Sequence, residues 1–596
     1  MSTQHNPLRL AAALIASALL SALFALPTAA QTASAASGLA HLEAVAPVAP
    51  CASLQSADLS TAVGTRTTVA SAKEQRVGRS LYCVVKGTIA PEIRFEARLP
   101  ASGWTQRFLQ LGCGGLCGHL DIRVERDEGC APAQHSELVL ASTDMGHEGA
   151  NLGDGSFGKD PQKRIDFAYR GVHLTAVVTK ALIEKYYGRK PRYSYFSGCS
   201  DGGREALMEV ERFPNDFDGV AAGAPAMNFQ VQNSFYHAWQ YVSNRDAAGK
   251  AILLAGRLPL LHKVVLDECD ALDGVRDGLI SDPRACHPKL VEAQCKPGQD
   301  AAGCLTAEEI AVALKFYAGP HDAAGHRFTI GGPQPGSELA WQGVYVPNAP
   351  DQDVMSRGSS LETIKYVAFE TNPPETYTLA DFRFDQATFE KLAAFHRLYD
   401  ATDTDLSGFQ SRGGKLILWH GWSDPHISPI NTIAFYQGVL GQLGADKAAS
   451  TLRLFLFPGL YHCGGGDGFS AFDVLSPLMA WVESGQAPDR IVAGQPAFDR
   501  PPMMGPPPGD HDGPPPADMG PPPPAPIKAE RPIFAYPQVA RYAGTGEVSR
   551  PENWIAAQPS TPEPTSYDWE GANFMKPDFH LEYTVKDGAA VPVTKK

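Results

Sequence analysis

A serine between two glycines carries the clearest chemical signal in this sequence. The run Gly198-Cys199-Ser200-Asp201-Gly202 fits the pattern G-x-S-x-G. A strand-like run at 193–197 precedes it, and helical spacing at 205–212 follows. In that context, small flanking residues permit the sharp turn that exposes a nucleophilic hydroxyl at the end of a strand. The sequence therefore predicts that Ser200 is a catalytic nucleophile, and the alternative is an ordinary glycine-rich turn.

A serine hydroxyl needs a base to take its proton, and the base needs a carboxylate to orient it. When the serine lies in such a strand-to-helix turn, the acid and then the histidine follow it along the chain. Asp424 and His462 each follow a strand-like run in that order. We predict that Asp424 orients His462 and that His462 accepts the Ser200 proton. The rival histidines are His420, for which we favour a structural role, and His426, which we expect to line the pocket.

Cys199 and Cys463 are the immediate neighbours of Ser200 and His462. If the serine and the histidine share a hydrogen bond, these cysteines must also lie close together. A disulfide needs Cα atoms about 4.4–6.8 Å apart. We therefore predict a Cys199–Cys463 disulfide that holds nucleophile and base together, and the alternative is that the two cysteines pair separately.

Strand-like and helical runs alternate around these residues. The strand-like runs are 81–85, 93–99, 108–111, 138–142, 193–197, 415–419 and 452–457; the helical runs are 165–187, 205–212, 430–443 and 478–482, with Ser476 and Pro477 as the expected cap and first position of the last one. This alternation predicts an α/β fold with a mostly parallel sheet. Between 226 and 405 the apolar runs become short and irregular, which indicates an inserted domain.

Composition and charge exclude several classes of protein. The 596 residues are 43% hydrophobic and 19% charged, as in soluble proteins, which excludes a mostly disordered chain and a polytopic membrane protein. The formal charge is −14, and an acidic chain repels phosphate backbones, so we predict no nucleic-acid partner.

The first 30 residues have the features of a secretory signal peptide. Arg9 is followed by an apolar run at 10–26 and then by small residues. A transmembrane anchor is the alternative, but the apolar run is short, so we predict no stable membrane anchor. Export makes disulfides the default for the 11 cysteines, and their odd number leaves at least one thiol.

Two further segments are judged from their composition or pattern. Residues 501–526 contain 13 prolines, which favour an extended polyproline conformation. We interpret this proline-rich segment as a solvated loop, with a docking segment as the alternative. The run 153–158 matches G-x-G-x-x-G, but it trails its strand and Pro161 follows it, so we predict no organic cofactor.

Four short runs together match a known family. They are GCSDGGRE at 198–205, RFPNDFDGVAAGAPA at 212–226, SD at 423–424 and HC at 462–463. With them, the sequence from about Cys51 to Ala556 resembles the tannase and feruloyl esterase family. The resemblance implies an α/β-hydrolase core, a lid inserted between nucleophile and acid, and the triad Ser200, Asp424 and His462.

The N–H of the residue after the nucleophile, Asp201, is one expected oxyanion donor. The resemblance places the second donor at Gly115, with Gly114 as the near alternative. The expected organisation is a signal peptide at 1–30, a first core segment at 38–225, a lid domain at 226–405, a second core segment at 406–556 and a tail at 557–596.

An acidic loop follows Cys269. Taken alone, it reads as a solvated acidic loop, and its spacing is not that of an EF-hand. The resemblance implies instead a structural Ca²⁺ that braces the lid, held by the side chains of Asp270, Asp273 and Asp277 and the carbonyls of Val275 and Leu279. The resemblance also implies the disulfides Cys269–Cys286, Cys51–Cys83 and Cys295–Cys304. Among Cys113, Cys117 and Cys130 we favour a Cys117–Cys130 bond.

These features together predict an exported carboxylic ester hydrolase acting on a small aromatic ester. Feruloyl or related hydroxycinnamoyl esters are the first choice, and galloyl esters are the second. For mono(2-hydroxyethyl) terephthalate, Arg357 is a candidate for binding the free carboxylate, although a surface arginine is the simpler interpretation. Ile427 stands where that subgroup has an aromatic clamp, which weakens the terephthalate alternative. With His426, these residues are the expected substrate contacts.

Two other classes stay open at this stage. One is a non-catalytic binding protein on a hydrolase scaffold, and the other is a metal-dependent hydrolase. The complete set Ser200, Asp424 and His462 argues against the first. The sequence does not specify the oligomeric state, nor whether the exported protein is periplasmic or extracellular.

Overall fold

The computed structural model describes residues 38–123, 129–497, 525–564, 566–577 and 580–593, which all belong to one unit of the chain. The expected signal peptide at 1–30 and nearly all of the proline-rich segment lie outside these residues. Among the described helices, none has the length and apolar character needed to cross a membrane.

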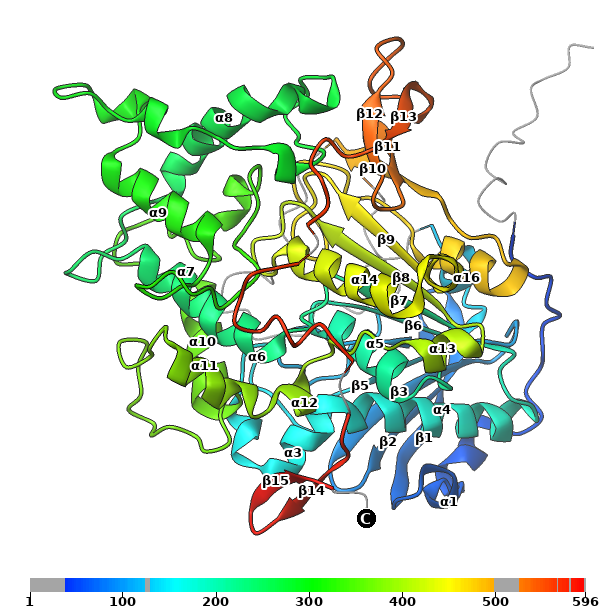
Figure 1. Ribbon diagram of the computed structural model, residues 1–596. Helices are drawn as coiled ribbons and strands as arrows, with labels where there is room; N and C mark the ends of the chain where they lie inside the picture. Colours follow the sequence, from blue (N-terminus) through cyan, green and yellow to red (C-terminus); the bar gives the residue numbers. More distant parts are fainter. Residues whose placement is uncertain (1–37, 124–128, 498–524, 565, 578–579, 594–596) are drawn as a thin grey trace, which may run out of the picture. The chain divides into compact units, whose positions relative to one another are not determined.

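A nine-stranded sheet runs through the centre of the described part (Figure 1). Its strands lie in the order β1-β2-β3-β5-β4-β6-β7-β8-β9. Their bounds are β1 (Thr67–Val77), β2 (Ser80–Ile89), β3 (Ile93–Pro100), β4 (Arg107–Leu111), β5 (Leu138–Thr143), β6 (Tyr193–Cys199), β7 (Gly219–Gly223), β8 (Lys415–Gly421) and β9 (Leu452–Phe457). The pairs from β5 to β9 are parallel, and the pairs among β1, β2, β3 and β5 are antiparallel. The predicted α/β fold with a mostly parallel sheet is confirmed.

Helices cover both faces of the sheet, which buries its apolar strands. One face packs against α4 (Gly171–Tyr187), α5 (Asp201–Arg212) and α14 (Pro429–Leu443), and the other packs against α16 (Leu475–Ser484). Strands buried on both sides read as continuous apolar runs, which is why the sequence revealed β4, β5, β8 and β9. Helix α4 ends where Gly188 adopts the left-handed conformation, with φ of 70°.

The register of the parallel strands brings the candidate residues to one edge. Cys199 pairs with Gly223, and Gly223 pairs with Trp419. The carboxyl ends of β6, β7 and β8 therefore lie side by side. Ser200 follows β6, and Asp424 follows β8, so both leave the sheet at this edge. Ligands bind at the carboxyl ends of strands in open α/β sheets, so this edge is the place for a site.

Residues 224–414 connect the adjacent strands β7 and β8 without adding a strand to the central sheet. Most of their helices lie together beside the sheet, in the green part of Figure 1, whereas the last one lies apart and contacts α5. In chain order, the helices are α6 (Phe229–Val231), α7 (His237–Ser243), α8 (Leu258–Cys269), α9 (Ala307–Ala318), α10 (Met355–Tyr366), α11 (Gln386–Ala393), α12 (His396–Tyr399) and α13 (Ser407–Ser411). Two apolar clusters, around Trp341 and around Phe235, form cores separate from those of the sheet.

The C-terminal residues form two-stranded pairs that sequence patterns did not reveal. They are β10 (Arg490–Pro496) with β11 (Ile527–Phe534), β12 (Val539–Tyr542) with β13 (Trp554–Ala557), and β14 (Tyr583–Lys586) with β15 (Ala589–Pro592). The proline-rich segment connects β10 to β11. The last pair, which belongs to the expected tail, contacts α3 (Pro161–Ile165).

Two helix starts and one disulfide differ from the predictions. Helix α5 begins at Asp201, four residues early, because Ser200 itself is the cap. Helix α16 begins at Leu475, since the Asp473 carboxylate accepts the first N–H groups and leaves Ser476 inside the helix. The predicted Cys117–Cys130 bond is wrong: Cys113 and Cys117 form the disulfide, and Cys130 remains a buried thiol.

Candidate active site

Ser200 occupies a strained turn between β6 and α5. Its φ of 66° and ψ of −121° lie outside the regions that non-glycine residues usually adopt. The turn is fixed because Ser200 N donates to Gly223 O at 3.0 Å and Ser200 O accepts from Ala226 N at 3.0 Å. A Cβ on Gly198 would lie 2.3 Å from Gly202 O, so only glycine fits there. This is the geometry of a nucleophile elbow, with a partly exposed serine at its apex.

Asp424 and His462 are in direct contact. Asp424 Oδ2 lies 2.7 Å from His462 Nδ1, and the His462 side chain is 18% exposed. The other carboxylate oxygen, Oδ1, accepts the backbone N–H groups of His426 at 2.8 Å and Ile427 at 3.1 Å. A carboxylate on Nδ1 makes that nitrogen the donor, which leaves Nε2 of His462 as an acceptor.

A second histidine, His420, also contacts Asp424. Its Nε2 lies 3.1 Å from Asp424 Oδ2, and its Nδ1 lies 2.8 Å from Thr432 Oγ1. Burial alone raises the pKa of Asp424, but His462 and the hydrogen bonds from both imidazoles outweigh it and hold this pKa far below its ordinary value. The carboxylate therefore stays charged. His420 is fully buried, in keeping with the structural role expected for it.

The predicted Cys199–Cys463 disulfide is present and joins the two loops. The Cα atoms of the two cysteines are 5.8 Å apart although they are separated by 264 positions in the chain. Ser200 and His462 are thereby tethered through their immediate neighbours. The disulfides Cys51–Cys83, Cys269–Cys286 and Cys295–Cys304 are present as well.

Two further histidine rings lie beside His462. The His426 ring centroid is 4.6 Å from that of His462, and the buried His237 of α7 is 5.7 Å from His426. Burial, together with the nearby His462, lowers the pKa of His237 to about 3, so this ring is neutral at pH 7. Its Nδ1 lies 2.8 Å from Ser356 Oγ. Sequence reasoning missed His237, because nothing in its local pattern separates it from an ordinary core histidine.

The other two expected substrate contacts differ in their surroundings. Ile427 is buried directly beside Asp424. Arg357 follows Ser356 on α10, but its guanidinium is 45% exposed and pairs with Asp353 at 3.2 Å. The structure thus brings Ile427 and His426 to Asp424 and His462, whereas Arg357 pairs with Asp353, a residue just before its helix.

The glycine loop after β4 lies against the elbow. A Cβ on Gly112 would lie 2.7 Å from Gly202 Cα, so the two segments touch through glycines. Gly115 has φ of 62°, and a Cβ there would lie 2.3 Å from Leu152 O. At Gly114 nothing obstructs a Cβ. Asp201 is the first residue of α5, where backbone N–H groups have no partner within the helix.

The acidic loop lies next to the loop that carries His462. Asp270 accepts the N–H groups of Asp277 and Gly278, and Asp273 accepts Ser281 Oγ at 2.6 Å. The buried Arg531 of β11 pairs with Asp277 and lies 3.7 Å from Asp273. The Arg531 guanidinium stacks on the Trp554 ring at 3.7 Å. Sequence reasoning missed Arg531 because it lies more than 250 positions along the chain from Asp277.

These donors suit a hard cation. Arg531 contacts the carboxylates of Asp273 and Asp277, and Asp270 adds to the negative charge around it. Ca²⁺ prefers oxygen ligands of this kind, although among the described residues these three carboxylates do not all lie within 4.8 Å of one another. Burial and the neighbouring Asp277 raise the pKa of Asp273, as expected for crowded acids. The side chain of Leu279, at the end of the loop, lies against Gly459, three residues before His462. Anything that fixes the acidic loop therefore supports the histidine loop.

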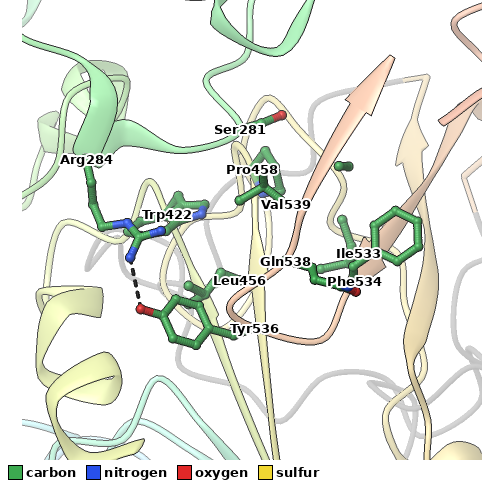
Figure 2. Close-up of a pocket in the computed structure, with 11 residues that line it drawn as sticks. Ser281, Arg284, Trp422, Leu456, Pro458, Ile533, Phe534, Tyr536, Gln538 and Val539 are labelled. Carbon is green, nitrogen blue, oxygen red and sulfur yellow. Dashed lines mark hydrogen bonds between the residues drawn. The ribbon is translucent and has the colours of Figure 1, made fainter. Parts of the chain in front are cut away.

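A small cavity lies between β9, the β11–β12 segment and residues 281–284 (Figure 2). Arg284 borders it and donates to Tyr536 Oη at 2.9 Å. Trp422 is its nearest lining residue in sequence to Asp424. Neither Ser200 nor His462 lines this cavity, so it is separate from the contacts described above.

Comparisons with known proteins show which family the chain resembles in sequence and fold. A sequence model of the family described as tannase and feruloyl esterase matches residues 76–557. A mono(2-hydroxyethyl) terephthalate hydrolase from Piscinibacter sakaiensis is 32% identical, over 80% of this chain and 85% of that protein. A probable feruloyl esterase B-1 from Aspergillus flavus is also 32% identical, over 73% of this chain and 81% of that protein.

One of the solved structures that resemble this chain is feruloyl esterase B from Aspergillus oryzae. It superposes with a TM-score of 0.69 at 26% identity, covering 82% of this chain and 97% of that one. The tannin acyl hydrolase of Aspergillus niger has the same fold, with a TM-score of 0.61 over 83% of this chain and 90% of that one.

Proposed function

The chain belongs to the tannase and feruloyl esterase family and is therefore a carboxylic ester hydrolase, and we propose that it is an exported serine esterase that cleaves small esters of aromatic acids. One observation carries the proposal. The strained Ser200 elbow is tethered by a disulfide to a histidine that is already oriented by a buried, charged aspartate.

Ser200, His462 and Asp424 divide the chemistry among them. Ser200 Oγ attacks the ester carbonyl while His462 Nε2 takes its proton. His462 then protonates the leaving alcohol, and an acyl group remains on Ser200. Water deprotonated by His462 releases the acid and restores the serine. Asp424 keeps the proton of the resting imidazole on Nδ1 and stabilises the imidazolium.

The oxyanion that forms at each step needs aimed donors. The backbone N–H groups of Asp201 and Gly115 supply them in this proposal. Two features support the assignment. Asp201 is at the start of α5, and Gly115 adopts a left-handed conformation in which any other residue's Cβ would clash with Leu152 O. Replacing one donor in such a hole costs about 10²–10³ in kcat.

An aromatic acyl group suits the surroundings of His462. The neutral rings of His426 and His237 and the apolar side chain of Ile427 gather on that side. Flat rings pack against aromatic acids by stacking or edge contacts. Hydroxycinnamoyl esters of the feruloyl type are the first choice, and galloyl esters are the second. The exposed pairing of Arg357 with Asp353 does not favour terephthalate monoesters.

Export and calcium complete the proposal. The signal-like segment at 1–30 and five disulfides suit an oxidising compartment. Asp270, Asp273 and Asp277, with the carbonyls of Val275 and Leu279, would hold Ca²⁺. The ion would supply positive charge to a crowded acidic loop and fix that loop against the histidine loop. It takes no part in the ester chemistry.

The test is turnover of a substrate panel by purified wild-type protein, Ser200→Ala and Ser197→Ala. The panel is methyl ferulate, methyl gallate and mono(2-hydroxyethyl) terephthalate. We expect hydrolysis of methyl ferulate by the wild type and Ser197→Ala, and loss of at least about 10³-fold in Ser200→Ala. Retained cleavage in a folded Ser200→Ala variant would refute the serine mechanism, and preference for another panel member would refute the feruloyl assignment.

A further inference from the structure

Three ionisable side chains are fully buried directly behind the elbow, on the first turns of α5. Asp201, Arg204 and Glu205 are each at most 2% exposed. Arg204 binds both oxygens of Asp201, with Nε–Oδ1 of 2.6 Å and Nη2–Oδ2 of 3.0 Å. Its remaining donors go to the carbonyls of Ala168 and Phe167, and its guanidinium lies over the Phe167 ring. Arg204 therefore fixes the Asp201 carboxylate, and with it the start of the helix.

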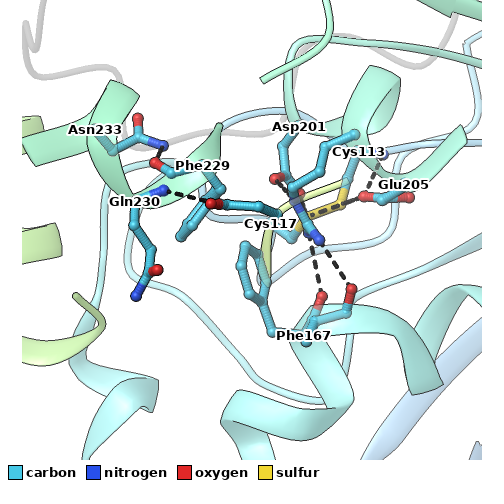
Figure 3. Close-up of polar contacts among 11 residues, drawn as sticks. Cys113, Cys117, Phe167, Asp201, Glu205, Phe229, Gln230 and Asn233 are labelled. Atoms are coloured by element: carbon cyan, nitrogen blue, oxygen red, sulfur yellow. Dashed lines mark hydrogen bonds and ion pairs between the residues drawn. A yellow bond between two sulfur atoms is a disulfide. The ribbon is translucent and has the colours of Figure 1, made fainter. Parts of the chain in front are cut away.

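Glu205 reaches from the same helix to the glycine loop. Its Oε1 accepts the Cys113 N–H at 3.3 Å and lies 2.8 Å from Cys113 Sγ and 3.4 Å from Cys117 Sγ. Figure 3 shows Glu205 and Asp201 gathered around the disulfide that closes this loop. Gly115 lies between the two cysteines. Glu205 thus contacts the segment that carries one candidate oxyanion donor while it belongs to the helix that carries the other.

The charges around Glu205 indicate a neutral carboxyl. Two buried carboxyl groups, Asp201 and Glu205, share the single positive charge of Arg204. Burial raises the pKa of Glu205 well above its ordinary value, and the nearby Asp201 raises it further against the opposing effect of Arg204. One oxygen of Glu205 and one of Asp201 lie within 4.8 Å of each other, and among the described residues Glu205 Oε2 is buried with no other hydrogen-bond partner. A protonated Glu205 can donate to Asp201, whereas two carboxylates so close would repel each other.

We propose that Glu205 is a positioning residue for ester hydrolysis: its carboxyl accepts the Cys113 N–H, lies against the Asp201 carboxyl, and so sets the spacing between the two oxyanion donors. The inference rests on the proposed function, because it assigns the donors to Gly115 and Asp201. Two N–H groups on separate segments can stabilise one oxygen only if their spacing is fixed. Glu205 is a side chain that contacts both segments.

The experiment uses three substitutions at Glu205 and one matched control. Glu205→Ala removes both contacts, and Glu205→Met fills the same space without polar atoms. Glu205→Gln keeps one acceptor and one donor in place. Glu209→Ala is the control, because Glu209 is one turn further along α5, is 1% exposed and also lies within 4.8 Å of a second carboxyl, that of Asp216. It contacts neither candidate donor segment.

The measurements are kcat and KM for a p-nitrophenyl ester, with melting temperature recorded for each variant. We expect kcat to fall roughly 30- to 100-fold in Glu205→Ala and Glu205→Met, less than the full loss of one donor, with KM within about threefold of wild type. Glu205→Gln should recover kcat to within about fivefold, and Glu209→Ala should keep it within about fivefold even if it melts earlier.

Three outcomes would overturn the proposal. One is a kcat within threefold of wild type for a folded Glu205→Ala or Glu205→Met. Another is an equal fall in Glu209→Ala, which would mean that helix stability alone matters. The third is a Glu205→Gln variant as impaired as Glu205→Ala. Ser200→Ala in the same assay distinguishes failure of the proposed function from failure of the Glu205 proposal. An active Ser200→Ala contradicts the proposed function. An inactive Ser200→Ala beside an unimpaired Glu205→Ala contradicts only the role of Glu205.

Discussion

Replacing Asp424 by asparagine changes one atom and should nearly abolish turnover. In the wild type, Asp424 Oδ1 accepts two backbone N–H groups, and Oδ2 faces His462 Nδ1. An asparagine must keep its oxygen toward the two N–H donors, so its NH₂ group points at His462 Nδ1. That nitrogen must then accept, and the imidazole proton moves to Nε2. A protonated Nε2 cannot take the proton of Ser200.

The expected loss follows from this change of tautomer. Asparagine in the corresponding position of a serine-histidine-aspartate triad lowers kcat by about 10⁴. Each factor of ten corresponds to about 1.4 kcal/mol, so the barrier should rise by roughly 5.5 kcal/mol. The second imidazole, His420, also loses its acceptor at Asp424, so the melting temperature should fall modestly as well.

The assay compares kcat of Asp424→Asn with that of Asp218→Asn on methyl ferulate. Asp218 is the control because its carboxylate also accepts a backbone N–H, that of Ser194 at 2.8 Å, but lies at the opposite end of β7 from the site. We expect near-wild-type kcat for Asp218→Asn. A folded Asp424→Asn that keeps more than a tenth of wild-type kcat would refute the reasoning on the His462 tautomer.

Three other perturbations have defined outcomes. Replacing Cys199 and Cys463 together by alanine opens a loop of 264 residues. Chain entropy predicts that the free energy of unfolding falls by about 5–6 kcal/mol, and removal of a native disulfide typically costs about 2–5 kcal/mol. The midpoint of denaturant unfolding should therefore shift to lower concentration and kcat should fall; an unchanged midpoint contradicts the tethering role. Gly115→Ala places a Cβ 2.3 Å from Leu152 O at positive φ, so kcat should drop at least about tenfold. Gly114→Ala is unobstructed and should lower kcat less. A larger loss in Gly114→Ala would assign the second oxyanion donor to Gly114 in place of Gly115. Removing calcium with a chelator should lower the melting temperature, and CaCl₂ but not MgCl₂ should restore it; Asp277→Asn should weaken that response, and identical melting with and without calcium contradicts the metal site.

Sequence reasoning found the elements whose pattern is local. Strands β8 and β9 are unbroken apolar runs, and Ser200 lies in a motif whose glycines the turn requires. By contrast, β1 is a mostly polar antiparallel strand at the edge of the sheet, and β7 consists of small residues. Neither has a periodicity that separates it from a loop.

The parts of the site that were missed depend on long-range contacts. His237 reaches His426 only because the 224–414 connection folds back over the sheet edge, and Arg531 meets the acidic loop across more than 250 residues. The Cys113–Cys117 bond was missed because spacing alone does not favour Cys117 pairing with Cys113 over Cys130. The contacts of Glu205 depend on that loop geometry, so no motif could reveal them.

The central claim is that Ser200 is acylated during turnover with the help of His462. The most direct measurement is rapid quenching of the wild type and His462→Ala with a p-nitrophenyl ester, followed by intact mass and peptide mapping. The account predicts one acyl group in the wild type, on the peptide that contains Ser200, and none within the same time in His462→Ala. An adduct on another residue, or p-nitrophenol release without any covalent intermediate under single-turnover conditions, would contradict it.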